Sequence, residues 1–151
     1  MIHYYHQETD YTCAPACIRM ILSKYDIFLS EKEIEKGVGC TSECGTDDDG
    51  EILKFFTSRH FEATLHENWE FTDLKKFLDE GYDIIINYFI SKEQEWHYAI
   101  VENIDDQYIT LIDPEYWPDT QYPPPSFYTN WHNSSGKLVR SFITMKKTLE
   151  K

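Results

Sequence analysis

One cysteine in this sequence stands where a helix start would favour nucleophilic chemistry. Cys13 precedes Ala14, Pro15 and Ala16, and apolar residues at helical spacing follow. The positive end of the helix dipole favours the thiolate, which is the form of cysteine that attacks a carbonyl. Position alone favours the other interpretation, a buried structural cysteine, so Cys13 needs partners before it can be given a role.

A histidine and an aspartate could be those partners. His97 lies within a β-rich run at residues 96–101, and Asp113 ends the next run at 108–113. If the two runs form a hairpin, Asp113 could accept a hydrogen bond from His97 that fixes the ring tautomer and stabilises the imidazolium. Two plainer interpretations stay open. The histidine could be satisfied within its strand, and the aspartate could start a turn before Pro114.

Gln7 stands shortly before Cys13 and could complete such a site. Acyl transfer builds negative charge on the carbonyl oxygen. A glutamine amide and the backbone N–H at the start of the Cys13 helix would donate hydrogen bonds to it. A single glutamine is uninformative, and only its order with Cys13, His97 and Asp113 suggests a site.

The elements that must hold these side chains divide into a helical part and a later sheet. Helices are predicted at 16–25, 30–36, 48–59 and 73–80. Ser30 opens a capping box, and Thr46 and Thr72 are the expected caps of the third and fourth helices. Strands are predicted at 83–89, 96–103, 107–112 and 138–145. N-terminal helices packed on a C-terminal antiparallel sheet make the expected fold α+β.

Between the last two predicted strands, residues 114–125 are rich in proline and aromatics. Such a stretch is expected to form a long ordered loop. The aromatic side chains in and after it could line a substrate groove beside Asp113 or simply cover the sheet. They are Tyr116, Trp117, Tyr122 and Phe127.

The bulk composition limits the classes of function. With 151 residues, of which 41% are hydrophobic, residues 1–151 are predicted to form a single domain with its own core. The net charge of −13 argues against binding nucleic acid or anionic membranes and is compatible with a basic peptide substrate. No apolar run reaches the ~20 residues of a membrane helix. The N-terminus lacks a signal-peptide pattern, so a cytoplasmic location is expected.

Disulfide and metal chemistry are the alternatives for the four cysteines, Cys13, Cys17, Cys40 and Cys44. Without a signal peptide, free thiols are favoured over bridges. Both pairs are spaced more widely than the knuckles of structural zinc sites. Cys17 is predicted to be a core residue one turn after Cys13, with a redox pair as the weaker alternative. The acidic run 47–49 lacks the alternating ligands of a calcium loop and is interpreted as charge at a helix start. No metal or cofactor is predicted.

Together these residues resemble a known family. Residues 7–17, Gln-Glu-Thr-Asp-Tyr-Thr-Cys-Ala-Pro-Ala-Cys, look like the opening of the papain-like bacteriocin-leader peptidases. These are the double-glycine peptidases fused to some export ATPases, together with their stand-alone relatives. Later segments that resemble the family are 45–46, 81–87, 96–101, 111–114 and 127–131. One departure is Ala14, where the family often has glycine, because its methyl group could crowd the approach to Cys13.

The resemblance implies a papain-like fold and a cysteine peptidase acting on a peptide or protein substrate. It implies Cys13 as the nucleophile and His97 as the general base and then acid. It also implies Asp113 as the orienting group and Gln7 as the oxyanion donor. The sequence has no ATP-binding loop of the form GxxxxGK followed by Ser or Thr, so a stand-alone, single-domain member is expected. Two alternatives keep the same fold: an acyl transferase (a transpeptidase or a phytochelatin-synthase-like enzyme) and a catalytically silent peptide-binding domain.

Overall fold

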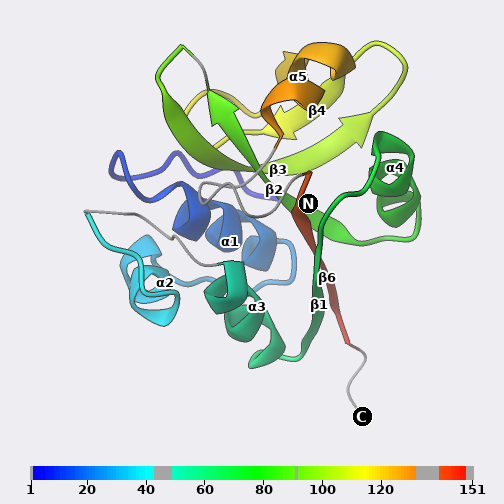
Figure 1. Ribbon diagram of the computed structural model, residues 1–151. Coiled ribbons are helices and arrows are strands. Elements are labelled where there is room, and N and C mark those ends of the chain that lie inside the picture. Colours follow the sequence, from blue (N-terminus) through cyan, green and yellow to red (C-terminus); the bar gives the residue numbers. More distant parts are fainter. Residues whose placement is uncertain (1, 43–48, 91, 132–139, 149–151) are drawn as a thin grey trace.

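An antiparallel sheet with helices on both faces forms the protein (Figure 1). The computed structural model describes residues 2–42, 49–90, 92–131 and 140–148. The helices within these ranges are α1 (Cys13–Ser23), α2 (Glu31–Gly37), α3 (Asp49–Thr57), α4 (Phe71–Asp79) and α5 (Pro124–Asn130). The strands are β1 (Phe61–His66), β2 (Asp83–Ile90), β3 (Glu95–Ile104), β4 (Ile109–Ile112), β5 (Thr120–Tyr122) and β6 (Phe142–Lys147). The order across the sheet is β1-β6-β2-β3-β4-β5, and every neighbouring pair is antiparallel, which confirms the predicted α+β class.

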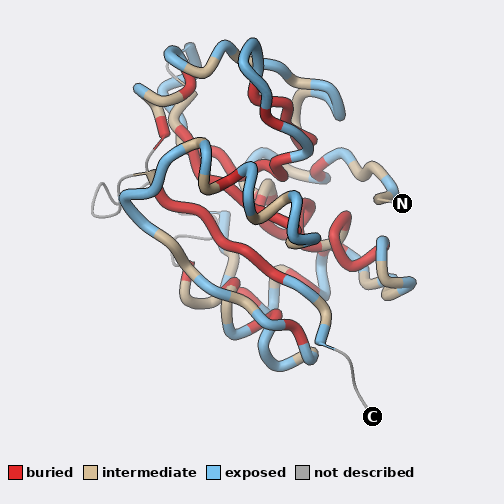
Figure 2. Tube along the Cα trace, turned by 90° about the vertical axis from the view of Figure 1, so that its right-hand side faces the viewer, coloured by how far each residue is buried: buried red, intermediate tan, exposed pale blue. Residues whose placement is uncertain are grey.

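Each face of the sheet packs against its own group of helices. α1, α2 and α3 form one hydrophobic core with strand residues such as Ile85 and Ile100. α4 and α5 form a second core with Ile86 and Val101, the residues that follow Ile85 and Ile100 in the same strands. Successive side chains of a strand point to opposite faces, so one run of apolar residues serves both cores. Figure 2 shows the buried residues concentrated in α1 and the central strands, with exposed residues on the outer segments.

The helix caps agree only in part with the prediction. The capping box at Ser30 is confirmed, because its side chain accepts the Glu33 N–H at 3.1 Å and the Glu33 carboxylate accepts the Ser30 N–H at 3.2 Å. The predicted cap Thr72 is wrong, since α4 already begins at Phe71 and its N-cap is Glu70. The Asp73 carboxylate accepts a hydrogen bond from the Glu70 N–H at 2.9 Å. The expected cap Thr46 lies outside the described residues, as do Asp47 and Asp48 of the acidic run.

The sequence patterns did not reveal β1, β5 and α5. β1 is an edge strand that obtains its backbone partners from β6 near the other end of the chain, with Phe61 opposite Lys147. β5 and α5 lie in and beyond the stretch predicted to be a loop. Pro124 and Pro125 occupy the first turn of α5, where a missing N–H costs nothing, and the buried Phe127 attaches the helix to the sheet. All three elements depend on distant partners rather than on local sequence.

Strand register brings the chemically important residues to one end of the sheet. Tyr88 on β2 lies opposite His97 on β3. In the β3–β4 hairpin Ile100 lies opposite Ile112, so the chain returns toward His97 when it leaves β4. Asp113 is the next residue, and it therefore reaches the His97 end of the hairpin.

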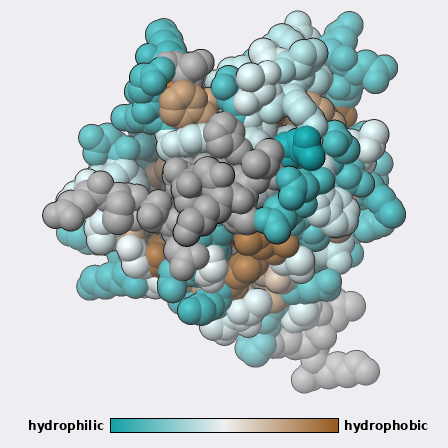
Figure 3. All heavy atoms as spheres, in the orientation of Figure 1, coloured by the Kyte–Doolittle hydropathy of each residue, from teal (hydrophilic) through white to brown (hydrophobic). Residues whose placement is uncertain are grey.

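The surface is consistent with the acidic composition. Hydrophilic residues cover most of the face seen in Figure 3, and the hydrophobic patches between them are small. In the part of the chain that the structure describes, none of the helices has the length and apolar character needed to cross a membrane.

Candidate active site

The β3–β4 hairpin brings a histidine and an aspartate into direct contact. His97 Nε2 lies 2.7 Å from Asp113 Oδ1. Both side chains are almost completely buried, with exposures of 4% and 0%. This bond orients the imidazole and places its proton-bearing Nε2 on the carboxylate, which leaves Nδ1 for proton exchange.

Cys13 is the first residue of α1, and its half-buried side chain is hydrogen-bonded to His97. The N-cap Thr12 makes no side-chain bond to the helix, and the first turn contains no acidic residue. Pro15 in this turn has no N–H. The donors that the helix itself does not use are therefore the N–H groups of Cys13 and Ala14, next to the sulfur. An uncapped helix start of this kind can bind developing negative charge.

The protonated form of His97 is strongly stabilised. Burial by itself would lower the pKa of His97, but the hydrogen bonds to Asp113 and Cys13, together with their charges, raise it from 6.5 to about 10. At neutral pH the imidazolium is therefore the favoured form. A protonated imidazole beside a cysteine is the setting in which a thiolate nucleophile is stable.

Asp113 is fixed by donors on both carboxylate oxygens. Oδ1 also accepts the backbone N–H groups of Glu115 at 2.9 Å and Tyr116 at 3.1 Å, and Oδ2 accepts the Tyr88 hydroxyl at 2.6 Å. Burial opposes ionisation, yet the bond and charge of His97, with the other donors, lower the pKa of Asp113 below its ordinary value. The two bonds to backbone N–H groups also make Asp113 the start of a turn. Both interpretations of this residue therefore apply.

The segment before α1 is attached to the loop that follows Asp113. The Gln7 N–H donates to the carbonyl oxygen of Pro114 at 2.8 Å, and the Tyr4 hydroxyl donates to that of Asp113 at 2.7 Å. The Gln7 side chain is buried, and its Nε2 donates to the carbonyl oxygen of Thr9 at 2.8 Å. An amide nitrogen carries two N–H donors, so the bond to Thr9 leaves one for a substrate oxygen.

Sequence reasoning missed Tyr88 and Tyr4, whose hydroxyls hold the side chain and the backbone of Asp113. Tyr88 lies in an apolar run that predicts only a buried strand. The single available signal was its hydroxyl, because a buried hydroxyl needs a partner. Only the strand register shows that this partner is Asp113.

The sequence profile of the Peptidase C39 family matches residues 1–136. The chain belongs to this family. It is also 32% identical over 110 residues to an uncharacterised protein of Methanothermobacter marburgensis, covering 72% of this chain and 68% of that protein.

Solved structures related to the C39 family share the fold at low sequence identity. The peptidase domain of Streptococcus ComA, a bifunctional ABC transporter, superposes with a TM-score of 0.76 at 17% identity, covering 97% of this chain and 100% of that one. A double-glycine-motif protease from an AMS/PCAT transporter, in complex with a leader peptide, gives 0.75 at 19% identity, covering 98% and 93%. A C39-like peptidase from Bacillus anthracis gives 0.75 at 12% identity, covering 99% and 96%. These matches confirm the predicted papain-like fold.

The departure from the C39 pattern at Ala14 is accommodated by the core. Ala14 is 1% exposed and packs in the hydrophobic core shared by α1–α3 and the sheet. Its methyl group is therefore buried among core side chains.

The other cysteines have different surroundings. Cys17 is fully buried, and its thiol donates to the carbonyl oxygen of Tyr98 at 3.5 Å. Its burial confirms the predicted core residue and raises the pKa of the thiol well above its ordinary value. Cys40 is half-buried and donates to a backbone oxygen at 3.5 Å. Cys44 lies outside the described residues.

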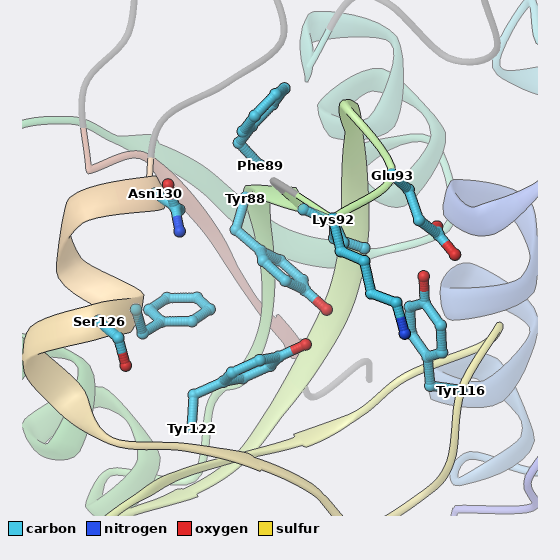
Figure 4. Close-up of a pocket in the computed structure, with 10 residues that line it drawn as sticks. Tyr88, Phe89, Lys92, Glu93, Tyr116, Tyr122, Ser126 and Asn130 are labelled. Carbon is cyan, nitrogen blue, oxygen red and sulfur yellow. The ribbon is translucent and has the colours of Figure 1, made fainter.

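A pocket of about 370 Å³ opens beside the candidate site (Figure 4). Of the four aromatic residues singled out in the sequence, Tyr116, Tyr122 and Phe127 line it, whereas Trp117 is 73% exposed on the surface. Two lining rings, those of Tyr88 and Tyr116, pack edge-on against His97 with centroid distances of 5.8 and 5.9 Å. The aromatic segment thus lines a groove and also covers the sheet.

Three carboxylates, those of Glu93, Glu95 and Glu115, lie close together beside His97 and the pocket, and are called the acidic rim below. Among the described residues, Glu93, Glu95 and Glu115 are the group whose ligand atoms lie close enough to share a metal ion, within 4.8 Å of one another. Glu115 Oε2 lies 3.9 Å from His97 Nδ1. Such surface carboxylates often gather without an ion, and a cation there would oppose the imidazolium of His97. The cluster is best interpreted as negative charge at the edge of the site.

Proposed function

We propose that this C39 family member is a cysteine peptidase that cleaves a peptide bond through an acyl-enzyme on Cys13. One observation carries the proposal. The buried imidazole of His97 is hydrogen-bonded to Asp113 at 2.7 Å and also to Cys13. A histidine placed in this way can exchange a proton with the sulfur and deliver it to a leaving group.

The reaction divides into two halves. The Cys13 sulfur attacks the carbonyl carbon and forms a C–S bond. The proton on His97 then passes to the amine nitrogen as the C–N bond breaks. Water next attacks the thioester while His97 takes one of its protons, and the C–S bond breaks to release the acid and regenerate Cys13. Asp113 keeps the ring oriented in both halves.

The negative oxygen of each tetrahedral intermediate needs donors that are in place beforehand. We assign this task to the second N–H of the Gln7 amide and to the backbone N–H of Cys13. Two features support the assignment: the bond from Gln7 to the Pro114 carbonyl and the helix start without a side-chain cap. Donors fixed in this way need no reorganisation when charge develops.

The substrate class is extended from the relatives. The similar structure from the AMS/PCAT transporter is a double-glycine-motif protease with a leader peptide bound. We propose that this chain likewise cleaves a peptide after two consecutive glycines. Its net charge of −13 and the acidic rim favour a peptide with basic residues near the cleavage site.

Alkylation tests the nucleophile without knowledge of the substrate. Iodoacetamide at neutral pH should label Cys13 much faster than the buried Cys17, which is an internal control in the same chain. His97→Ala should slow the labelling of Cys13, whereas His3→Ala, at an exposed position, should not. Equal labelling of Cys13 with and without His97 would contradict the proposal.

Cleavage tests the reaction itself. A peptide library that contains Gly-Gly, with Ala-Ala versions of the same peptides as controls, should show mass-spectrometric cleavage after the glycines. Cys13→Ala should abolish it. Cleavage that survives in Cys13→Ala would exclude the mechanism. An added amine acceptor separates hydrolysis from acyl transfer by the mass of the product.

A further inference from the structure

The Asp113 carboxylate is anchored differently on its two oxygens. Oδ1 is shared by three donors: His97 and the N–H groups of Glu115 and Tyr116. Oδ2 lies on the other side and accepts the Tyr88 hydroxyl at 2.6 Å. A carboxylate held through one oxygen can still turn about its Cβ–Cγ bond. A donor on the second oxygen opposes that rotation.

Tyr88 is itself held in place. It is 2% exposed, and its ring packs edge-on against His97. Burial and the charge of Asp113 raise the pKa of the Tyr88 hydroxyl far above its ordinary range, so it keeps its proton. This single proton goes to Asp113. In the hydrogen bond that joins Tyr88 to Tyr122, the Tyr122 hydroxyl must therefore be the donor.

The two tyrosines form a line of hydroxyls from the pocket to the histidine. Tyr122 belongs to β5 and Tyr88 to β2, and Figure 4 shows their hydroxyl groups directed toward each other in the pocket. The hydrogen bonds run from Tyr122 to Tyr88 and from Tyr88 to Asp113, which binds His97 through its other oxygen.

We propose that Tyr88, supported by Tyr122, is a positioning residue that keeps the Asp113 carboxylate aligned with the His97 ring. The expected effect of Tyr88 on the rate of cleavage rests on the proposed function. Tyr88 does not reach the reacting atoms in this role. It acts through Asp113, and removal of its hydroxyl weakens the hydrogen bond between Asp113 and His97.

Of the charged and titratable groups that face the histidine, Asp113 is the one to which the Tyr88 hydroxyl donates. Cys13 and Asp113 bind His97 directly, and the Glu115 carboxylate lies 3.9 Å from its Nδ1. Tyr116 packs on the ring. A shift in the titration of His97 after a change at Tyr88 therefore reports on Asp113.

The chain offers a closely matched control. The Tyr25 hydroxyl donates to Oδ2 of the buried Asp83 at 2.7 Å, and Tyr25 follows the end of α1 that is opposite to Cys13. Tyr25→Phe removes the same kind of bond as Tyr88→Phe, but from a carboxylate that does not touch His97. The two variants should lose similar thermal stability, which separates a positioning role from a structural one.

The kinetic experiment compares these variants on a cleaved peptide. Tyr88→Phe should lower kcat roughly tenfold with KM nearly unchanged, because the lost bond involves a charged acceptor. Tyr122→Phe should give a smaller loss in kcat, and Tyr25→Phe should leave kcat at the wild-type value. Equal kcat in Tyr88→Phe and Tyr25→Phe would overturn the inference.

An NMR titration of the His97 ring gives a second test that needs no substrate. Burial lowers the pKa of this imidazole and Asp113 raises it, so a looser Asp113 should let it fall by roughly one unit in Tyr88→Phe. No shift, or a rise, would contradict the positioning role. If the wild-type protein cleaves no peptide, the proposed function fails while this titration still decides the role of Tyr88.

Discussion

The two sides of the candidate site are built with different degrees of constraint. On the sheet side, Asp113 is fully buried, and both of its carboxylate oxygens accept hydrogen bonds. On the helix side, Cys13 is half-buried, and the helix that it begins has no side-chain cap and no acid in its first turn. The proposed base is thus held by buried hydrogen bonds, whereas the proposed nucleophile remains partly exposed at a helix start without a side-chain cap.

This difference matches what each side would have to do. A histidine must hold one orientation and one tautomer to move protons, and buried hydrogen bonds provide that. A nucleophile must reach the substrate, and donors at a helix start can bind an oxyanion only if the protein has not already capped them. Changes on the sheet side should therefore disturb proton transfer, and changes on the helix side should disturb charge stabilisation.

The largest effect is expected from the sheet side. Asp113→Asn should reduce kcat/KM by about 10³-fold or more, because an amide can present an N–H to Nε2 and impose the wrong tautomer. Steady-state kinetics on the cleaved peptide measures it, with Asp119→Asn at an exposed loop position as the control. A loss below tenfold would show that the two sides are not divided in this way.

A smaller effect is expected from Gln7, the proposed oxyanion donor near the helix side. Gln7→Ala should lower kcat by about 10²-fold. It should leave the iodoacetamide labelling of Cys13 unchanged, because alkylation creates no oxyanion. Gln107→Ala, at an exposed turn, is the control. Slower labelling in Gln7→Ala would mean that Gln7 acts on the thiol and that the proposed division of roles is wrong.

The protonated histidine should make stability depend on pH. The pKa of His97 is raised from 6.5 to about 10, so its stabilisation is complete below pH 6.5 and is lost as the pH rises through 10. The free energy of unfolding should fall over this interval by up to about 5 kcal/mol more than in His97→Ala. Urea unfolding at several pH values measures the difference. If the free energy of unfolding depended on pH in the same way in the wild type and in His97→Ala, the stabilised imidazolium of His97 would be refuted.

The smallest effect separates the two cysteines of α1. Cys17→Ala should cost about 1 kcal/mol of stability, as small losses of packing in a core do, and should leave cleavage unchanged. Thermal unfolding and the cleavage assay on the same preparation test this. Loss of activity in Cys17→Ala would instead support the redox pair considered for Cys13 and Cys17.

Much of the fold could be predicted because it depends on short-range patterns. The Ser30 capping box, the β-rich run from Asp83 and the β3–β4 hairpin are each specified by residues within a few positions of one another. The edge strand β1 could not be predicted, because its stability comes from β6 at the far end of the chain. The same holds for Glu70, which replaced Thr72 as the cap once packing placed the start of α4 at Phe71.

By itself, the sequence determined the order of Gln7, Cys13, His97 and Asp113, the helix start at the cysteine and the hairpin that returns Asp113 toward His97. Local propensity and strand alternation are sufficient for those features. Only the tertiary structure decided that Tyr88 donates to Asp113, that Tyr122 lies behind it and that Ala14 is buried in the core. These contacts join β2, β5 and the end of β4, and their distances depend on sheet register and core packing. No local pattern encodes either of these.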